Sequence, residues 1–513
     1  MGPALNDALI RVPDLLASHI LLAGSALLLG LAISLPLCVW SARRPLVARA
    51  TLGLASLIQT IPSLALLALF YPLLLALSGL VGGAIPALGF LPSLLALTLY
   101  ALLPILRNGI TGLNTLDPAV LEAADGMGMT GWQKLLLVEL PLVVPVLMAG
   151  IRTAAVWTIG AATLSTTVGQ PSLGDLIFAG LQTQNWALVL AGCGAAAGLA
   201  LTVDALLGVA EHGIAQRKRW RVVAALGALA LGLAIALIPA MPSGQKSVVI
   251  GAKGFSEQYI LARLIGHRLE AAGYRVTYRE GLGSAVVFGA LAGGDIDVYV
   301  DYSGTIWTNQ MRRADVPDRA AIVRGVGDWA QRTHGVTMLG ALGFENAYAF
   351  AMRADDAKRR GIITLDDLVP ASPALDFASD LEFLERPEWA AVKRAYPLQF
   401  KSARAYNPTF MYRAIDSGRA DVISAFSSDG RIAAQGLTVL GDPRHAIPGY
   451  DAILLLAPGR GGDARFTGAL RPLVGHIPVE AMRQANLMVD RDTDKKSPDE
   501  AARWLETKVG LAD

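Results

Sequence analysis

Residues 247–259 are SVVIGAKGFSEQY, and this stretch decides the fold class of the second half of the chain. Its β-branched residues predict a strand, the glycines that follow predict a turn, and residues 257–272 have the pattern of an amphipathic helix. A strand at 274–279, a helix at 284–292 and a strand at 296–300 are expected next. Strands separated by helices predict an open, largely parallel sheet that binds ligands beyond the carboxyl ends of its strands.

Charge divides the chain into two parts. It has 513 residues, of which 53% are hydrophobic and 17% are charged. The first 221 residues carry 11 Lys or Arg and 9 Asp or Glu, whereas residues 222–513 carry 33 of each sign. Because soluble domains carry about 25% charged residues, we expect the first part to lie among membrane lipids and the second to be globular.

Two further counts exclude classes of function. The net charge of +2 gives no reason to expect a nucleic-acid partner. The two cysteines, Cys38 and Cys193, both lie in apolar stretches, so neither a disulfide framework nor a Cys-based zinc site is expected. The six histidines are scattered without ligand spacing. We therefore expect no metal site, no cofactor and no enzyme active site.

Six apolar stretches are long enough to cross a membrane. They are 15–42, two stretches between 50 and 106 with a turn at 78–86, and 141–164, 186–209 and 222–240. Counting alternate sides gathers most basic residues on one side, which the positive-inside rule makes cytoplasmic. The N-terminus and everything after Pro239 are then expected outside, and the opening segment lacks the basic start of a cleaved signal peptide.

The sequence thus predicts three regions in a multi-pass membrane protein, and the resemblances given below imply the inner membrane of a bacterium. Residues 1–215 form a transmembrane domain, residues 216–246 form the sixth span and a linker, and residues 247–513 form an extracytoplasmic domain.

The largest predicted cytoplasmic loop includes LEAADGMGMT at 121–130 and VELP at 138–141. This pattern predicts a short helix, a glycine turn, a second helix and a proline re-entry into the membrane. Glu122, Ala123, Ala124 and Gly128, with Leu140-Pro141, resemble the loop of ABC importer permeases in identity and spacing. The resemblance implies docking on a separate ABC ATPase subunit, since the chain has no Gly-x-x-x-x-Gly-Lys-Ser/Thr segment of its own.

A second resemblance covers the globular part. Five blocks, in order, resemble the substrate-binding proteins for glycine betaine, choline and carnitine: 250–258 (IGAKGFSEQ), 301–305 (DYSGT), 383–387 (FLERP), 423–432 (ISAFSSDGRI) and 448–451 (PGYD). The whole chain therefore resembles a permease fused to its binding protein. The implied fold is an all-α six-span membrane domain followed by a two-lobed α/β domain. Residues 247–350 and the C-terminal segment would form one lobe, and the middle segment would form the other.

The chemistry of such ligands identifies candidate residues. A quaternary ammonium has no N–H, so aromatic faces hold it through cation–π contacts, and a carboxylate prefers a cationic partner such as Arg. By family position Tyr302, Tyr348, Phe426 and Tyr450 resemble the aromatic cage, with Phe344 as a substitute for Tyr348. Lys253 and Arg386 match family positions that contact the carboxylate of the ligand. Thr305 would add a hydroxyl to the site.

Structural roles are the alternative for all of these residues. Each aromatic side chain could pack in a core, and Lys253 and Arg386 could be solvated surface charges. Asp429 and Arg431 are expected to form a structural pair, and Glu257 is expected to serve only in the first turn of its helix.

The predicted function is ATP-driven import of glycine betaine, choline or carnitine for osmotic protection, by two copies of this chain with the ATPase. Import of ergothioneine, or of another bulky trimethylammonium betaine, is the main alternative, because the same cage serves both. A ligand-gated receptor or channel would use the same outer domain without an ATPase dock, and an enzyme acting on a bound amine would need turnover by that domain.

Overall fold

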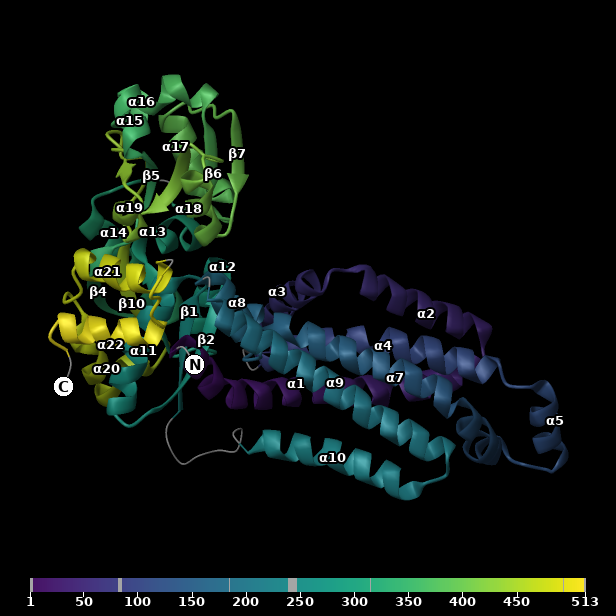
Figure 1. Ribbon diagram of the computed structural model, residues 1–513. Helices are drawn as coiled ribbons and strands as arrows, with labels where there is room; N and C mark the ends of the chain where they lie inside the picture. The colour runs from purple at the N-terminus through teal and green to yellow at the C-terminus, as the bar shows by residue number, and fades with distance from the viewer. Residues whose placement is uncertain are drawn as a thin grey trace. The chain divides into compact units, whose positions relative to one another are not determined.

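The computed structural model describes residues 3–81, 85–183, 185–238, 247–313, 315–491 and 493–511. The chain separates into a helical unit and an α/β unit, each described by itself (Figure 1). The helices up to residue 238 are α1 (Pro3–Ala42), α2 (Pro45–Thr60), α3 (Ser63–Val81), α4 (Phe90–Asn114), α5 (Pro118–Gly126), α6 (Gly131–Lys134), α7 (Leu140–Ala162), α8 (Gly174–Gln182), α9 (Trp186–Ala215) and α10 (Arg219–Leu237).

Membrane-spanning length is reached by five helical segments among the described residues. They are Leu9–Ala42, Phe90–Asn114, Gly131–Val168, Trp186–Ala215 and Arg219–Leu237. The pair Pro45–Thr60 and Ser63–Ser78 passes the same test together, which gives up to six spans. The number therefore agrees with the six spans that the sequence predicts.

The second span differs from the expectation in its shape. The sequence predicts one continuous span before the turn at 78–86, but α2 and α3 meet at an angle of 99°. The cause is Pro62, which disfavours the helical conformation in the residue before it, and Ile61 is extended with φ −72° and ψ 126°. Pro62 was the available signal, because a proline inside an apolar run ends or bends the helix.

Three charged side chains meet within the helical bundle. Arg152 of α7 donates from Nε and Nη2 to the Asp204 carboxylate of α9, at 2.8 and 2.7 Å. Its Nη1 donates to Glu211 Oε2 at 3.0 Å, one to two turns further along α9. Asp204 is therefore paired with a cation of a neighbouring helix.

The α/β unit contains two five-stranded sheets. The first sheet has the order β2-β1-β3-β10-β4, and the second has the order β7-β6-β8-β5-β9. The strands are β1 (Ser247–Lys253), β2 (Arg275–Leu282), β3 (Val298–Tyr302), β4 (Thr337–Glu345), β5 (Tyr348–Arg353), β6 (Asp376–Ser379), β7 (Ser402–Ala405), β8 (Val422–Phe426), β9 (Leu437–Val439) and β10 (Asp451–Leu456). The two-lobed α/β fold is thus confirmed.

Helices cover both sheets. They are α11 (Ser256–Ala271), α12 (Ser284–Ala292), α13 (Ser303–Thr305), α14 (Arg319–His334), α15 (Ala354–Arg360), α16 (Leu365–Ala371), α17 (Pro387–Ala395), α18 (Pro408–Asp416), α19 (Arg431–Ala434), α20 (Ala464–Leu470), α21 (Val479–Asp490) and α22 (Pro498–Lys508). Central strands are buried on both faces, as in β10, where five of the six residues are buried.

The prediction of largely parallel sheets was wrong. In the first sheet β1 is parallel to β2 and β3, but β10 is antiparallel to β3 and β4. In the second sheet β6 is parallel to β7 and β8, but β5 is antiparallel to β8 and β9. The reason is that the chain crosses from one lobe to the other before β5 and before β10. As a result β5 begins at the sheet edge where β8 ends, and β10 begins at the edge where β3 ends.

A histidine of α11 contacts two acidic side chains of α22, and this contact should make the stability of α22 depend on pH. His267 Nε2 lies 2.7 Å from Asp499 Oδ1, and His267 Nδ1 lies 3.1 Å from Glu506 Oε2. The hydrogen bond to Asp499 raises the pKa of His267 above its ordinary 6.5, and the bond from His267 lowers that of Asp499 to about 2. The histidine's contribution to stability is therefore complete below pH 6.5 and lost as the pH rises through the raised pKa, whereas that of Asp499 is lost only near pH 2.

We expect amide exchange in α22, corrected for its intrinsic pH dependence, to show weaker protection near pH 9 than near pH 6. His267→Gln should be weakly protected at both values. Protection that stays equal in the wild-type chain would mean that His267 is not charged in the folded state.

Candidate functional site

One pocket of the α/β unit lies where strand ends of both sheets meet. It has a volume of about 220 Å³. β1, β3 and β8 end there, whereas β5 and β10 begin there, since Tyr348 pairs with Phe426 and Ala452 pairs with Tyr302. The mixed sheets thus bring residues from both ends of strands to one edge, which is where open α/β sheets bind ligands.

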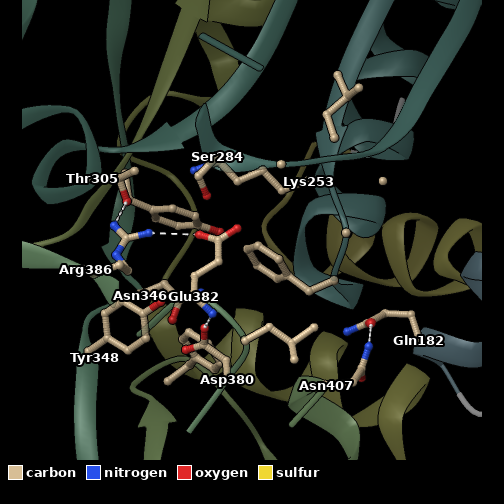
Figure 2. Close-up of a pocket in the computed structure, with 18 of the residues that line it drawn as sticks. Gln182, Lys253, Ser284, Thr305, Asn346, Tyr348, Asp380, Glu382, Arg386 and Asn407 are labelled. Atoms are coloured by element: carbon tan, nitrogen blue, oxygen red, sulfur yellow. Dashed lines mark hydrogen bonds and ion pairs between the residues drawn. The ribbon is translucent and has the colours of Figure 1, made fainter. Parts of the chain in front are cut away.

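All seven residues predicted to bind ligand line this pocket. They are Lys253, Tyr302, Thr305, Tyr348, Arg386, Phe426 and Tyr450. Phe344 is buried elsewhere and is not among the described residues that line the pocket, so the substitute for Tyr348 is not needed there. Figure 2 shows Lys253, Thr305, Tyr348 and Arg386 facing the same space.

Five aromatic rings surround the pocket, one more than predicted. Tyr348 lies 5.2 Å from Phe426 and 6.0 Å from Tyr450 between ring centroids, and its ring is nearly perpendicular to that of Tyr450. Phe255 stands between Tyr302 at 6.2 Å and Phe426 at 6.3 Å, stacked on both. These rings come from both lobes, so a cation in the pocket would meet aromatic faces on several sides.

Sequence reasoning missed Phe255 as a site residue. It lies in the turn after β1, within the same segment as Lys253. That position at a strand's carboxyl end was the signal that could have found it, because open α/β sheets bind ligands there.

The two basic residues of the pocket are already paired with buried acids. Lys253 Nζ bonds the Asp301 carboxylate, and the ammonium also lies 5.3 Å from the Tyr302 ring centroid. Arg386 Nη2 donates to Glu388 Oε1 at 2.9 Å. Lys253 is 4% exposed and Arg386 is 8% exposed, so neither is the solvated surface charge of the alternative interpretation.

The pair Arg386–Glu388 joins the two lobes. Arg386 Nη2 also lies 3.4 Å from Thr305 Oγ1, while Thr308 and Tyr450 donate hydroxyls to Glu388 Oε1. Burial acts to raise the pKa of Glu388, but the Arg386 guanidinium and the hydrogen bonds from Arg386 and Tyr450 outweigh it and lower the pKa below its ordinary value. Glu388 is therefore ionised, and it already accepts hydrogen bonds from Nε and Nη2 of Arg386.

An acidic edge that the sequence did not reveal completes the pocket. Asp380 Oδ1 accepts the backbone N–H groups of Glu382 and Phe383 at 2.7 and 3.1 Å, and Glu382 Oε2 lies 3.1 Å from Arg386 Nη1 (Figure 2). Asp380 Oδ2 is buried and has no hydrogen-bond partner within the described parts of the chain. Burial raises the pKa of Asp380. The pocket therefore has more acidic than basic side chains around it, and a bound cation would favour the ionised form of Asp380 against the effect of burial.

Two further residues or pairs were expected to have structural roles: the pair Asp429–Arg431 and Glu257. Arg431 Nη2 lies 2.5 Å from Asp429 Oδ2, so this pair forms as expected. Glu257, by contrast, is a fully buried carboxylate with four hydrogen-bond donors around it. Among the described residues no group of three or more His, Cys, Asp or Glu side chains could hold a metal ion.

A second candidate site is the loop at 115–139 of the helical unit. Helix α5 begins after the N-cap Asp117, and α6 begins after a capping box between Thr130 and Gln133. Gly128 adopts φ +74° between the two helices, a conformation that favours glycine. The predicted helix–turn–helix is thus present, although the chain continues through Pro141 as a helix rather than breaking there.

The loop exposes an apolar and acidic surface. Glu122 and Ala123 are exposed on α5, whereas Ala124 is buried. Met127 and Trp132 are 70% and 68% exposed. Both are large apolar side chains that the helical unit leaves uncovered.

Comparison with known proteins then gives the family. Residues 246–507 match the family described as "Substrate binding domain of ABC-type glycine betaine transport system". Residues 30–221 match "Binding-protein-dependent transport system inner membrane component". The chain belongs to these transporter families. It is a fused permease and substrate-binding component of an ABC importer, and these are not enzyme families.

Similar proteins include relatives with the same two parts and relatives with one. The chain is 29% identical over 481 residues to the "Ergothioneine transport permease/ergothioneine binding protein EgtU" of Helicobacter pylori strain G27, covering 90% of this chain and 83% of that protein. It is 39% identical over 194 residues to the "Glycine betaine/carnitine/choline transport system permease protein OpuCB" of Bacillus subtilis strain 168, covering 38% of this chain and 84% of that permease. A solved structure titled "Crystal structure of glycine betaine/carnitine/choline ABC transporter" aligns at 26% identity with a TM-score of 0.45, covering 52% of this chain and all of that one.

Proposed function

We propose that this fused permease and binding protein imports quaternary ammonium compounds, and that glycine betaine, choline or carnitine is the ligand taken up for osmotic protection. One observation carries the proposal: residues from six separate segments, chosen for the chemistry of a trimethylammonium ligand, all line a single pocket. Core packing alone would not require them to border the same space.

The charge of the pocket supports a cationic head group. Lys253 and Arg386 are neutralised by Asp301 and Glu388, and Asp380 and Glu382 add further negative charge. A ligand carboxylate would have to share Arg386 with Glu388, whereas a permanent cation meets aromatic faces and an acidic edge. Choline, which has no carboxylate, suits this balance best.

Ergothioneine is the second candidate. The relative named for ergothioneine transport is similar along 90% of this chain, through both its membrane and its binding parts. Because ergothioneine also carries a trimethylammonium group, the same rings would hold that end, and the Asp380–Glu382 edge would face the rest of the molecule.

Transport would proceed by hinged closure and ATP-driven alternating access. The outer domain, residues 247–513, would lie outside the inner membrane and present its ligand to the membrane domain, residues 1–215, with 216–246 as last span and linker. A separate ATPase would dock on Glu122, Ala123, Ala124 and Gly128, and two copies of the chain would form the pathway. This arrangement is favoured over a ligand-gated channel, because a channel needs no surface such as α5 for an ATPase.

Phe426→Leu tests the cage without disturbing a hydrogen bond. The change keeps apolar bulk but removes the ring face, so we expect choline to bind about 2- to 30-fold more weakly, the equivalent of about 0.5–2 kcal/mol. Titration calorimetry on the full chain in lipid nanodiscs measures this. Phe350→Leu, on the same strand pair but outside the pocket, is the control and should leave the affinity unchanged.

A titration panel tests the substrate. The full chain should bind small trimethylammonium compounds, so glycine betaine, choline and carnitine are compared with ergothioneine and with proline. Binding of ergothioneine alone would keep the transport mechanism and change the cargo. Absence of binding to all five would contradict the proposal.

A further inference from the structure

Glu257 is a buried carboxylate that does not line the ligand pocket but bonds to residues that do. It is the second residue of α11 and is 2% exposed. No Lys, Arg or His among the described residues forms an ion pair with it. A buried charge without a counter-ion is costly unless hydrogen bonds satisfy it, so its partners are informative.

Four neutral donors surround the two oxygens of Glu257. Oε1 accepts from Tyr302 OH at 2.5 Å and from Asn346 Nδ2 at 3.0 Å. Oε2 accepts from Ser428 Oγ at 2.5 Å and from Asn486 Nδ2 at 2.8 Å. One side chain therefore collects donors from four separate segments.

These four segments meet at the junction of the lobes. Tyr302 ends β3 of the first sheet, and Asn486 lies on α21, which packs against α11. Asn346 lies in the crossing between β4 and β5, and Ser428 lies in the turn after β8 of the second sheet. Across the same junction the Ser427 N–H donates to the Ala347 carbonyl, and the Ala347 N–H donates to Ser427 Oγ. Glu257 thus connects the first lobe, a crossing and the second lobe.

Two of the four donors also border the pocket. Tyr302 and Asn346 line it, and the Tyr302 hydroxyl accepts a further bond from Gln258 Nε2 at 3.0 Å. The orientation of the Tyr302 ring is therefore fixed from the side opposite the ligand. Removal of the carboxylate would free that ring and the junction together.

We propose that Glu257 is a positioning residue for ligand capture: its carboxylate holds the Tyr302 ring and the Asn346 amide against the pocket and ties both to the Ser428 turn of the second lobe. The inference rests on the proposed function in so far as the ligand is a quaternary ammonium. The connection that Glu257 makes between Tyr302, the crossing at Asn346 and the turn at Ser428 does not depend on which ligand binds.

The charge of Glu257 adds a readout that packing alone would not change. Burial raises the pKa of Glu257, and the hydrogen bonds from Ser428, Tyr302, Asn486 and Asn346 act against that rise. The charged groups nearby are paired among themselves: Lys253 with Asp301, and Arg431 with Asp429 and Asp490. A cation in the cage and the ionised form of Glu257 then stabilise each other, so cation affinity should fall as the pH falls.

The first arm of the test measures choline affinity on the full chain in nanodiscs. Glu257→Gln should weaken binding about tenfold or more, because two buried donors lose their acceptor. Tyr302→Phe, which removes only the bonded hydroxyl, should reproduce part of this loss, and the double variant should bind no more weakly than Glu257→Gln alone. The loss of affinity at low pH should become smaller in Glu257→Gln, and the part that remains should come from Asp380, whose pKa burial also raises. Additive losses, or unchanged affinity, would overturn the proposal.

Glu280→Gln is the matched control. Glu280 is a buried carboxylate of the same lobe, paired with Arg263 at 2.5 Å and not among the residues that line the pocket. Its replacement should leave choline affinity and its pH dependence as they are in the wild-type chain. Equal losses in both variants would mean that Glu257 acts only through general stability.

The second arm needs no ligand. Hydrogen exchange of the ligand-free chain should be faster at 345–348 and 427–430 in Glu257→Gln, and in Ser428→Ala, which keeps the carboxylate and removes one donor. Glu280→Gln should not change exchange there. If the wild-type chain binds no quaternary ammonium, the proposed function fails, and this arm still decides the inference: unchanged exchange at both segments in Ser428→Ala and Glu257→Gln overturns it.

Discussion

Replacement of Glu122 by Arg should abolish uptake of the ligand into cells while the purified chain still binds that ligand with wild-type affinity. Glu122 and Ala123 are exposed on α5, and no described residue of the ligand pocket belongs to this loop. A charge reversal on the surface proposed to meet the ATPase would place a like or unpaired charge at that contact, which costs several kcal/mol. The measurement pairs uptake of labelled choline in cells with calorimetry on the same variant.

A glycine pair on the same loop provides the control. Gly128 has φ +74°, so Gly128→Ala forces an alanine into a left-handed conformation at a cost of about 1–2 kcal/mol and should also impair uptake. Gly126, two residues earlier, lies in α5 with open space where a Cβ would stand, so Gly126→Ala should be tolerated. Full uptake by Glu122→Arg would mean that α5 does not couple ATP hydrolysis to transport. That result would favour the ligand-gated channel instead.

Arg386→Ala should destabilise the binding domain by about 3–5 kcal/mol, whatever it does to the ligand. Arg386 is buried against Glu388, whose side chain is fully buried, and the change leaves that carboxylate without its cation. For a domain of this size we expect the melting temperature to fall by about 6–20 °C. Trp389, in the next helix, gives a fluorescence signal for the transition.

A double variant separates stability from recognition. Arg386→Met with Glu388→Gln removes both charges together, so most of the lost stability should return. Weak binding by this stable variant would then report a contact between Arg386 and the ligand. A melting temperature for Arg386→Ala within about 2 °C of the wild type would show that the buried pair contributes little.

The residues that the sequence predicts to bind ligand could be proposed because they lie in short segments that can be recognised one at a time. The strand-end turns at 253–255, 302–305 and 426–429 and the segment at 383–387 each carry their own pattern, and the fold brings them to one pocket. Asp380 and Glu382 had no such pattern. Their importance comes from burial beside Arg386, and burial depends on segments far away in the sequence.

Lys253 and Arg386 illustrate the same limit. The residue types and their family positions predicted contact with a ligand carboxylate, but the sequence does not say which charges are already satisfied. Asp301 becomes the partner of Lys253 only when β3 pairs with β1. Glu388 stands two residues after Arg386, and this pair is enclosed only when Thr308 and Tyr450 of the first lobe bond to Glu388. Under the proposed function, a ligand carboxylate would therefore have to share Arg386 with Glu388.

The sequence by itself determined the division into a membrane part and a globular part, the approximate spans, the loop at 121–130 and the family of the binding domain. These features depend on local composition and spacing, because a span needs only about 20 apolar residues and a turn needs only its glycine or proline. Tertiary structure alone decided the mixed direction of the strands, the neutralised cations, the acidic edge of the pocket and the four hydrogen bonds of the buried Glu257. Each of these depends on which distant segments meet in a water-poor interior, where a hydrogen bond or a charge gains its energetic weight only from its partners.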